Sequence, residues 1–266
     1  MMEKKIFSPK ISVVMSIYNE EKFLDESIQS ILNQTLKDFE FIILNNSSTD
    51  KSLDIIKSYK DDRIIFINNK KNIGTSRSMN KGLKIAKGKY LVFFCGDDIS
   101  HPKRLEIGFN YLENNPHIFL IGSSAIYINE NGKEIRRFRK YDNYKMLAWR
   151  LRKSCSIIYP SIMCRNKKVS LDEKNVKMND YVLFFELLKR GENLTNLPHF
   201  LIKYRVHPGS MSVYDDKKEF EHLVNEVIEN FKGIKDNTLF FNKIYYSMKL
   251  FIHHLKTRKE KRISIF

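Results

Sequence analysis

The stretch Tyr90-Leu-Val-Phe-Phe-Cys-Gly-Asp-Asp98 decides how this chain folds, because an apolar run ends abruptly in two adjacent carboxylates. The run from Tyr90 to Phe94 is typical of a strand buried on both faces, and such strands belong to mostly parallel sheets. Open α/β sheets bind ligands at the carboxyl ends of their strands, where Asp97 and Asp98 stand. Two neighbouring carboxylates repel each other, so the pair is either solvated in a polar turn or neutralised by a cation. A divalent metal with a phosphate would satisfy the second case.

Strand and helix patterns alternate on both sides of this stretch. Apolar or β-branched runs predict strands at 11–17, 39–44, 64–67 and 119–128, and helical periodicity predicts helices at 20–32, after 47–50, at 76–86 and after Pro102. This rhythm predicts a doubly wound α/β sheet with flanking helices and a nucleotide-type site at its carboxyl edge. The glycine-rich signatures of dinucleotide folds and P-loops are absent from the sequence. Beyond a turn at Asn131-Gly132 the alternation stops, and helices are expected at 144–153, 180–190 and 239–255.

Composition narrows the class of protein. The 266 residues suit one large α/β domain, alone or with an extension, and the 42% hydrophobic and 29% charged residues are ordinary for a globular protein. No apolar run is long enough to span a bilayer, and residues 1–10 lack the apolar core of a signal peptide. Cys95, Cys155 and Cys164 form no zinc spacing and no disulfide framework. We therefore expect a cytoplasmic protein.

The net charge of +16 implies an anionic partner, which the charge alone leaves open among nucleic acid, phospholipid headgroups and a phosphorylated substrate. The excess gathers in residues 136–153 and in the tail at 256–262. A solvated basic face explains both clusters equally well. The apolar, aromatic stripe of the expected helix at 239–255 either packs on the parent domain or lies on a membrane, with the basic tail reaching anionic lipid.

Seven segments, in order from residue 10 to 212, resemble the inverting family-two glycosyltransferases of the GT-A fold. They are residues 12–20 (SVVMSIYNE), 27–35 (SIQSILNQT), 72–74 with 78–82 (NIG and SMNKG), 87–105 around the acids, 159–165 (YPSIMCR), 179–181 (NDY) and 204–212 (YRVHPGSMS). The resemblance, to the bacterial surface-polysaccharide type, implies a GT-A domain at 1–213. Its donor-binding half would lie at about 10–130 and its acceptor half at about 131–213, followed by a helical basic extension at 214–266.

The resemblance also implies roles for individual residues. Asp98 and His207 would bind a divalent metal, and Asp97 would contact the ribose or a metal-bound water. Oxygen ligands suit Mg²⁺ or Mn²⁺, and the imidazole favours Mn²⁺. Apart from the resemblance, His207 reads as a surface-loop histidine beside Pro208. The implied donor-binding residues are Ser16, Tyr18, Glu20, Asn45, Asn46, Asn72, Arg77 and Asp97.

Asp180 is the implied catalytic base. Inversion requires a group that removes the acceptor proton on the face opposite the leaving group. Asp180 stands at the start of an expected helix, where a carboxylate is also favoured simply by the helix dipole. Both readings of Asp180 remain open from the residues alone.

The chain departs from the family pattern in three segments, at four positions. Asn45 and Asn46 replace acids after the second strand, Cys95 replaces the outer acid of the metal motif, and Asn179 replaces a glutamate before the implied base. The nucleotide base is therefore left open.

The expected activity is metal-dependent transfer of a hexose or N-acetylhexosamine from a nucleotide diphosphate, with a UDP-sugar favoured. The expected acceptor is a glycan or a lipid-linked molecule of cell-surface polysaccharide synthesis, with peripheral association at the inner face of the cytoplasmic membrane. The alternatives are a nucleotidyltransferase and a degenerate, non-catalytic sugar-nucleotide binder. A nucleic-acid-binding protein is not expected, because no recognisable binding module is present.

Overall fold

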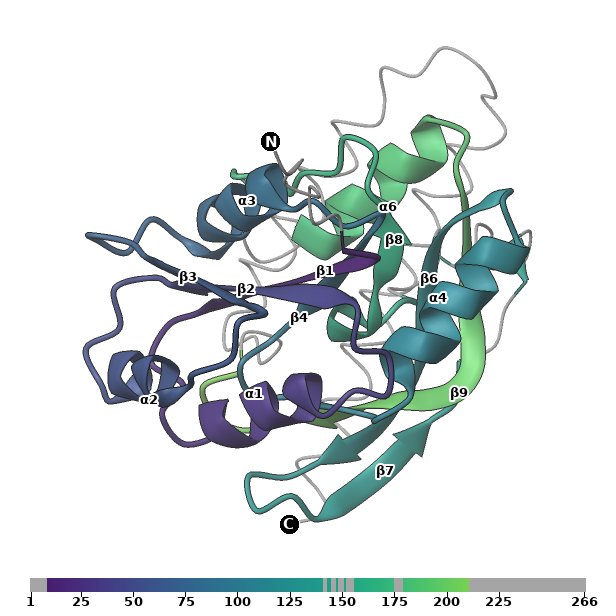
Figure 1. Cartoon of the computed structure of the whole chain (residues 1–266). Coiled ribbons are helices and arrows are strands. Elements are labelled where there is room, and N and C mark those ends of the chain that lie inside the picture. Colours follow the sequence, from purple (N-terminus) through teal and green to yellow (C-terminus); the bar gives the residue numbers. More distant parts are fainter. Residues whose placement is uncertain are drawn as a thin grey trace.

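The computed structural model describes residues 9–140, 143, 144, 147, 151, 156–174 and 179–210 (Figure 1). Its centre is a nine-stranded sheet in which eight strands follow the order β3-β2-β1-β4-β8-β6-β9-β5 and β7 pairs with β6. The α/β class predicted from the alternating patterns is confirmed.

The half of the sheet around Tyr90–Phe94 (β4) is parallel, as its buried apolar strands predict. β1 (Ile11–Ile17) lies between β4 and β2 (Phe39–Asn45), and β3 (Ile64–Asn68) forms the outer edge. All seven residues of β2 and all five of β4 are buried. The carboxyl ends of these strands therefore meet at one edge of the sheet.

The other half of the sheet is mixed, which the sequence patterns do not reveal. β8 (Met163–Arg165) runs antiparallel between β4 and β6 (Ile118–Ile128), and β6 pairs in parallel with β9 (Asn193–Arg205). The short β5 (Ile99–Ser100) and β7 (Glu134–Phe138) are antiparallel to β9 and β6. Short strands carry little periodicity, and the Pro198 within β9 interrupts its pattern.

Helices cover both faces of the sheet (Figure 1). Alternate strand residues separate two apolar layers, with Val14 in one and its neighbours Val13 and Met15 in the other. The layer of Val14 packs under α3 (Thr75–Ile85) and α6 (Asn179–Lys189), with the short 3₁₀ helix η1 (Tyr159–Ser161) at its margin. The opposite layer packs under α1 (Leu24–Leu32), α2 (Ser52–Ser58) and α4 (Arg104–Asn114).

The first helix begins later than the expected residue 20. Asn19 has a positive φ of 57°, and the carbonyl of Glu20 accepts hydrogen bonds from the N–H groups of Phe23 and Leu24. Residues 20–23 therefore form a turn that follows β1, and α1 starts at Leu24. This turn leaves the side chain of Glu20 at the carboxyl edge of the sheet.

Two expected elements lie outside the described residues. They are most of the helix at 144–153 and the whole of 211–266, which includes the helix at 239–255 and the basic tail. In the part of the chain that the structure describes, no helix is both long enough and apolar enough to cross a bilayer.

Candidate functional site

Three titratable side chains, Glu20, Asp97 and His207, meet at the carboxyl edge of the sheet and are called here the acid–histidine cluster. Glu20 follows β1, Asp97 follows the neighbouring strand β4, and His207 lies two residues beyond β9. One potential ligand atom from each side chain lies within 4.8 Å of the other two. The closest measured pair is Asp97 Oδ2 and His207 Nε2, 3.2 Å apart. Residues 110 positions apart in the sequence thus present ligands to one point.

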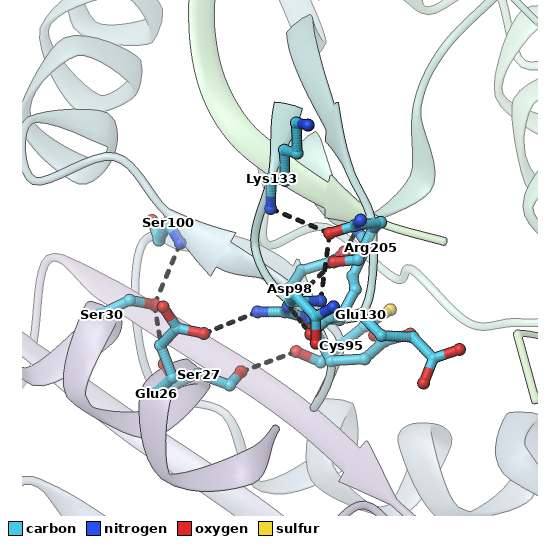
Figure 2. Close-up of polar contacts among 12 residues, drawn as sticks. Glu26, Ser27, Ser30, Cys95, Asp98, Ser100, Glu130, Lys133 and Arg205 are labelled. Atoms are coloured by element: carbon cyan, nitrogen blue, oxygen red, sulfur yellow. Dashed lines mark hydrogen bonds and ion pairs between the residues drawn. The ribbon is translucent and has the colours of Figure 1, made fainter. Parts of the chain in front are cut away.

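Arg205, two residues before His207, connects the end of β9 to this edge through hydrogen bonds and an ion pair (Figure 2). Its side chain is buried, and its Nε donates to the carbonyl of Asp97 at 2.8 Å. Nη1 donates to the carbonyls of Asn129 and Glu130 in the turn between β6 and β7 at 3.2 and 2.9 Å. Nη2 forms an ion pair of 2.6 Å with Glu26 of α1. A single guanidinium therefore joins β4, α1 and the β6–β7 turn to β9.

Asp98 is enclosed rather than presented to solvent. Its Oδ1 accepts the backbone N–H of Arg205 at 2.8 Å, and its buried Oδ2 has no hydrogen-bond partner among the described residues. Burial, followed by the charge of Asp97, raises the pKa of Asp98 well above its usual value. The buried Arg104 contributes a positive charge nearby, although its own pKa is lowered by burial to about 9. Cys95, Asp97 and Asp98 form a second group with ligand atoms within 4.8 Å of one another.

The acid–histidine cluster holds two acids and one histidine, and the pKa values of Glu20 and His207 are both raised. Burial and the charge of Asp97 raise the pKa of Glu20 to about 8. The hydrogen bond to Asp97, together with the charges of Asp97 and Glu20, raises the pKa of His207. Both shifts reflect negative charge gathered at a partly buried point, which a bound cation would relieve. Two carboxylates and an imidazole are a donor set that fits a divalent metal ion, and the second group, which shares Asp97, adds the carboxylate of Asp98 next to it.

Gly96 allows this close approach of the two strand ends. A Cβ on residue 96 would lie 2.8 Å from Cγ2 of Ile17 and 3.2 Å from Cγ of Glu20. Any side chain here would push the β4 loop away from the turn that carries Glu20. The glycine is therefore required for the geometry of the cluster.

Asn45, Asn46 and Asn72 form a hydrogen-bonded edge at the ends of β2 and β3. Asn46 Nδ2 donates to Asn72 Oδ1 at 2.8 Å, and Asn46 Oδ1 accepts from the backbone N–H of Ile73 at 3.1 Å. Asn45 Nδ2 donates to Asn68 Oδ1 at 2.8 Å. An aspartate at residue 45 or 46 would lose these donations, which gives a physical reason for the two asparagines that depart from the family pattern.

Three other expected donor-binding residues surround this edge. Ser16 is half-buried near the end of β1, and Tyr18 follows the strand with 45% of its surface exposed. Arg77 projects from the first turn of α3, and its Nε forms an exposed ion pair of 3.2 Å with Glu173. Arg77 therefore has a protein partner and is not presented as a free cation.

Asp180 lies in the first turn of α6, and its Oδ1 accepts the backbone N–H of Tyr181 at 2.8 Å. The preceding residue, Asn179, is buried, and its Nδ2 donates to Ser76 Oγ of α3 at 2.9 Å. This bond ties the start of α6 to α3. Asn179 thus serves to anchor the helix that carries Asp180.

Sequence reasoning missed Arg205, Glu26 and Arg104 as parts of the site. Arg205 stands inside the segment YRVH, so its position carried a signal, but only His207 was assigned a role there. Glu26 lies in the first turn of α1, and nothing in its local sequence distinguishes it from a solvated acid. Arg104 opens α4 six residues after Asp98, and its burial follows only from the fold.

Comparison with known proteins gives a consistent result at the level of sequence. The family model of Glycosyl transferase family 2 matches residues 12–172. An uncharacterized glycosyltransferase of Methanocaldococcus jannaschii is 38% identical over 256 residues, which cover 92% of this chain and 88% of that protein. The Escherichia coli protein WfaP, named as a UDP-Glc:alpha-D-GlcNAc-diphosphoundecaprenol beta-1,3-glucosyltransferase, is 29% identical over 95% of this chain and 98% of its own length.

Solved structures share the fold. TarS of S. aureus, residues 1–349 in complex with UDP-GlcNAc, superposes with a TM-score of 0.72 at 18% identity, covering 88% of this chain and 70% of that one. The mannosyltransferase PcManGT of Pyrobaculum calidifontis, solved with GDP-Man and Mn²⁺, gives a TM-score of 0.66 at 14% identity, covering 89% and 68%. The nine-stranded sheet with its flanking helices is therefore a GT-A fold.

Replacing Arg205 by Met tests whether its side chain stabilises the fold by joining β4, α1 and the β6–β7 turn to β9. The carbonyls of Asp97, Asn129 and Glu130 and the carboxylate of Glu26 lose their donor, so we expect a loss of about 2–4 kcal/mol in the free energy of unfolding, measured by urea denaturation. The matched control is Arg137→Met, because Arg137 pairs with Glu134 in an exposed position, where solvent screens the ion pair and its loss should change stability far less. Equal losses for the two variants would contradict the assigned role.

The stability of the metal-free protein should depend on pH through Glu20. Its pKa rises from 4.5 to about 8 on folding, so the folded state binds the proton more tightly and stability falls as pH rises through this window. The raised pKa of His207 acts in the same direction, since its contribution is also lost as pH rises. Melting temperatures from pH 5 to 9 in the presence of a chelator should fall, and Glu20→Gln should flatten the slope. An unchanged slope in that variant would show that another group is responsible.

Proposed function

The chain belongs to Glycosyl transferase family 2, and we propose that it is an inverting enzyme acting on a nucleotide diphosphate donor. It moves a hexose or N-acetylhexosamine, from a UDP-sugar in the first instance, to a glycan or lipid-linked acceptor of cell-surface polysaccharide synthesis. The observation that carries this proposal is the acid–histidine cluster at the carboxyl ends of parallel strands, where α/β sheets bind phosphorylated ligands.

Asp97, Asp98 and His207 are the proposed metal ligands. Asp97 joins the pair expected from the sequence because its Oδ2 already lies 3.2 Å from His207 Nε2. Asp98 would bind the ion through its unpaired Oδ2. Glu20, beside Asp97 and His207, would add negative charge that offsets the charge of the ion. A divalent ion held here supplies Lewis acidity that neutralises a diphosphate leaving group. The imidazole favours Mn²⁺ over Mg²⁺, and the related fold of PcManGT was solved with Mn²⁺.

The nucleoside of the donor is assigned to the adjacent strand ends. Ser16 and Tyr18 follow β1, and the asparagine edge of Asn45, Asn46 and Asn72 follows β2 and β3. Arg77 would reach the diphosphate only by leaving Glu173. A UDP-sugar is favoured because the name of WfaP specifies UDP-Glc and TarS was solved with UDP-GlcNAc. PcManGT was solved with GDP-Man, so the fold also accepts a purine.

Asp180 is the proposed base. At the start of α6 its carboxylate is favoured by the helix dipole, and a carboxylate can accept a proton. The bond from Asn179 to Ser76 holds this turn against α3, at whose amino end Arg77 also stands. Asp180 would remove the proton of the acceptor hydroxyl as the bond to the leaving diphosphate breaks.

Exposed positive charge on this chain supports an acceptor that lies in a membrane. WfaP is named for a diphosphoundecaprenol acceptor, which is a lipid. On β7 and just after it, Arg136, Arg137 and Arg139 are exposed beside Ile135, which is 56% exposed. Cationic side chains next to an exposed apolar residue suit an anionic lipid surface. The basic tail at 256–262 would add to this surface, at the inner face of the cytoplasmic membrane.

A non-catalytic sugar-nucleotide binder is the second candidate, since Cys95 and Asn179 replace acids of the family pattern. It would bind the donor without transferring the sugar. Binding and transfer must therefore be measured separately.

Donor binding and transfer should separate in two variants. A UDP-sugar with Mn²⁺ should raise the melting temperature of the parent; Asp97→Asn should abolish that shift, and Asp180→Asn should keep it. Loss of the base should lower transfer by about 10²–10⁴-fold, measured as release of nucleoside diphosphate with an acceptor panel. Asp62→Asn, an exposed acid before β3, serves as the control. Full transfer by Asp180→Asn would remove it as the base, and no shift with any nucleotide sugar would remove the proposed function.

Membrane binding should depend on the β7 arginines. Replacing Arg136 and Arg139 by Gln should weaken co-sedimentation of the full chain with phosphatidylglycerol vesicles by roughly 10- to 30-fold at low salt. The control removes equal charge from the exposed Lys57 and Lys60, near the end of α2, and should leave binding unchanged. Equal effects from both pairs would mean that net charge alone, and not this surface, attracts the lipid.

A further inference from the structure

The hydroxyl of Tyr159 is a buried polar group that the proposed mechanism does not yet use. Tyr159 opens η1, and its oxygen is buried with no hydrogen-bond partner among the described residues. Buried hydroxyls are nearly always paired, so an unpaired one requires a reason. The ring itself is well held, because it packs edge-on against Phe93 of β4 with centroids 5.7 Å apart.

The side chain of Tyr159 packs against β4 and against the apolar layer under α6, the two elements that precede the acids and carry Asp180. Phe93 is followed by Cys95 and Asp97, so the ring of Tyr159 rests on the strand that delivers the acids. The same side chain packs on the apolar layer that contains Tyr181 and Phe184 of α6, the helix that begins with Asp180. Burial raises the pKa of Tyr159 well above its usual value, and the charge of Asp180 raises it further. The hydroxyl therefore remains neutral and able to donate a hydrogen bond.

The position has a chemical meaning if the proposed function holds, and the inference rests on it. In an inverting displacement the reacting carbon lies between the leaving diphosphate and the incoming acceptor hydroxyl. A group that packs against both the strand leading to the metal-binding acids and the layer under the helix of the base is therefore a candidate contact of the transferred sugar. Sugars offer hydroxyl groups that both donate and accept hydrogen bonds, which is what a neutral phenol requires.

We propose that the Tyr159 hydroxyl hydrogen-bonds the transferred sugar of the donor and so helps to determine which sugar the enzyme accepts. The contact is to the sugar and not to the nucleoside or the metal. Tyr159 thereby becomes a specificity residue, and its missing partner is supplied by the substrate.

The test compares Tyr159→Phe with Tyr90→Phe, each of which removes one oxygen. Tyr90 is the matched control because its hydroxyl already donates to Glu113 at 2.8 Å and accepts from Arg165 at 3.3 Å, at the opposite end of β4. We expect Tyr159→Phe to melt at or above the temperature of the parent, and Tyr90→Phe to melt below it without altering donor affinity.

The decisive measurement is affinity with and without the sugar, in the presence of Mn²⁺. Tyr159→Phe should bind the nucleoside diphosphate, UDP or GDP, as the parent does, but should bind the nucleotide sugar about 3- to 10-fold more weakly. For two donors that differ only at one sugar hydroxyl, the ratio of their dissociation constants should be smaller in Tyr159→Phe than in the parent by a similar factor.

Four results would overturn the inference in distinguishable ways. A lowered melting temperature of Tyr159→Phe would mean that the hydroxyl has a structural partner. Equal weakening for the nucleoside diphosphate and the nucleotide sugar would place the contact outside the sugar. If the parent binds no nucleotide sugar, the proposed function fails and this inference fails with it. If the parent binds nucleoside diphosphate and nucleotide sugar equally tightly, this inference fails while the proposed function stands.

Discussion

The site depends on one buried cation, the guanidinium of Arg205. The guanidinium donates to the carbonyl of Asp97, to two carbonyls of the β6–β7 turn and to Glu26. The backbone N–H of Arg205 donates to Asp98. Burying a charge is costly unless its donors are satisfied, and here the neighbouring segments satisfy them. Arg205 needs these partners in order to be buried, and Asp97 and Asp98 in turn need Arg205 to hold their positions.

The acids and the histidine are held close together at a cost. Asp97, Asp98 and Glu20 crowd into a partly dry edge, and the pKa of each of the last two is raised by burial and by the charge of Asp97. A protein that needed only a stable turn would disperse these charges. These crowded acids, together with the glycine that lets the strand ends approach, suit a site that binds a cation.

The sequence allowed the parallel half of the fold and its acids to be predicted, because buried strands such as Tyr90–Phe94 have strong local patterns. The mixed half was not foreseen, since β8 has only three residues and β9 contains Pro198. The resemblance to family two located Asp97 and His207, but the hydrogen bonds that fix Asn45 and Asn46 depend on neighbours distant in sequence. The importance of Arg205 likewise arises from contacts that no local pattern encodes.

The hydrogen bond from Arg205 to the carbonyl of Asp97 spans 108 positions of sequence, and this separation bears on how the enzyme matures. During synthesis the four parallel strands and their acids emerge well before β9, so the early chain carries crowded carboxylates with neither their cationic partner nor the histidine. The proposed metal and donor site is therefore completed last, when residues 205–207 dock. Contacts of such long range also slow folding, which makes completion of this edge the late step in producing an active molecule.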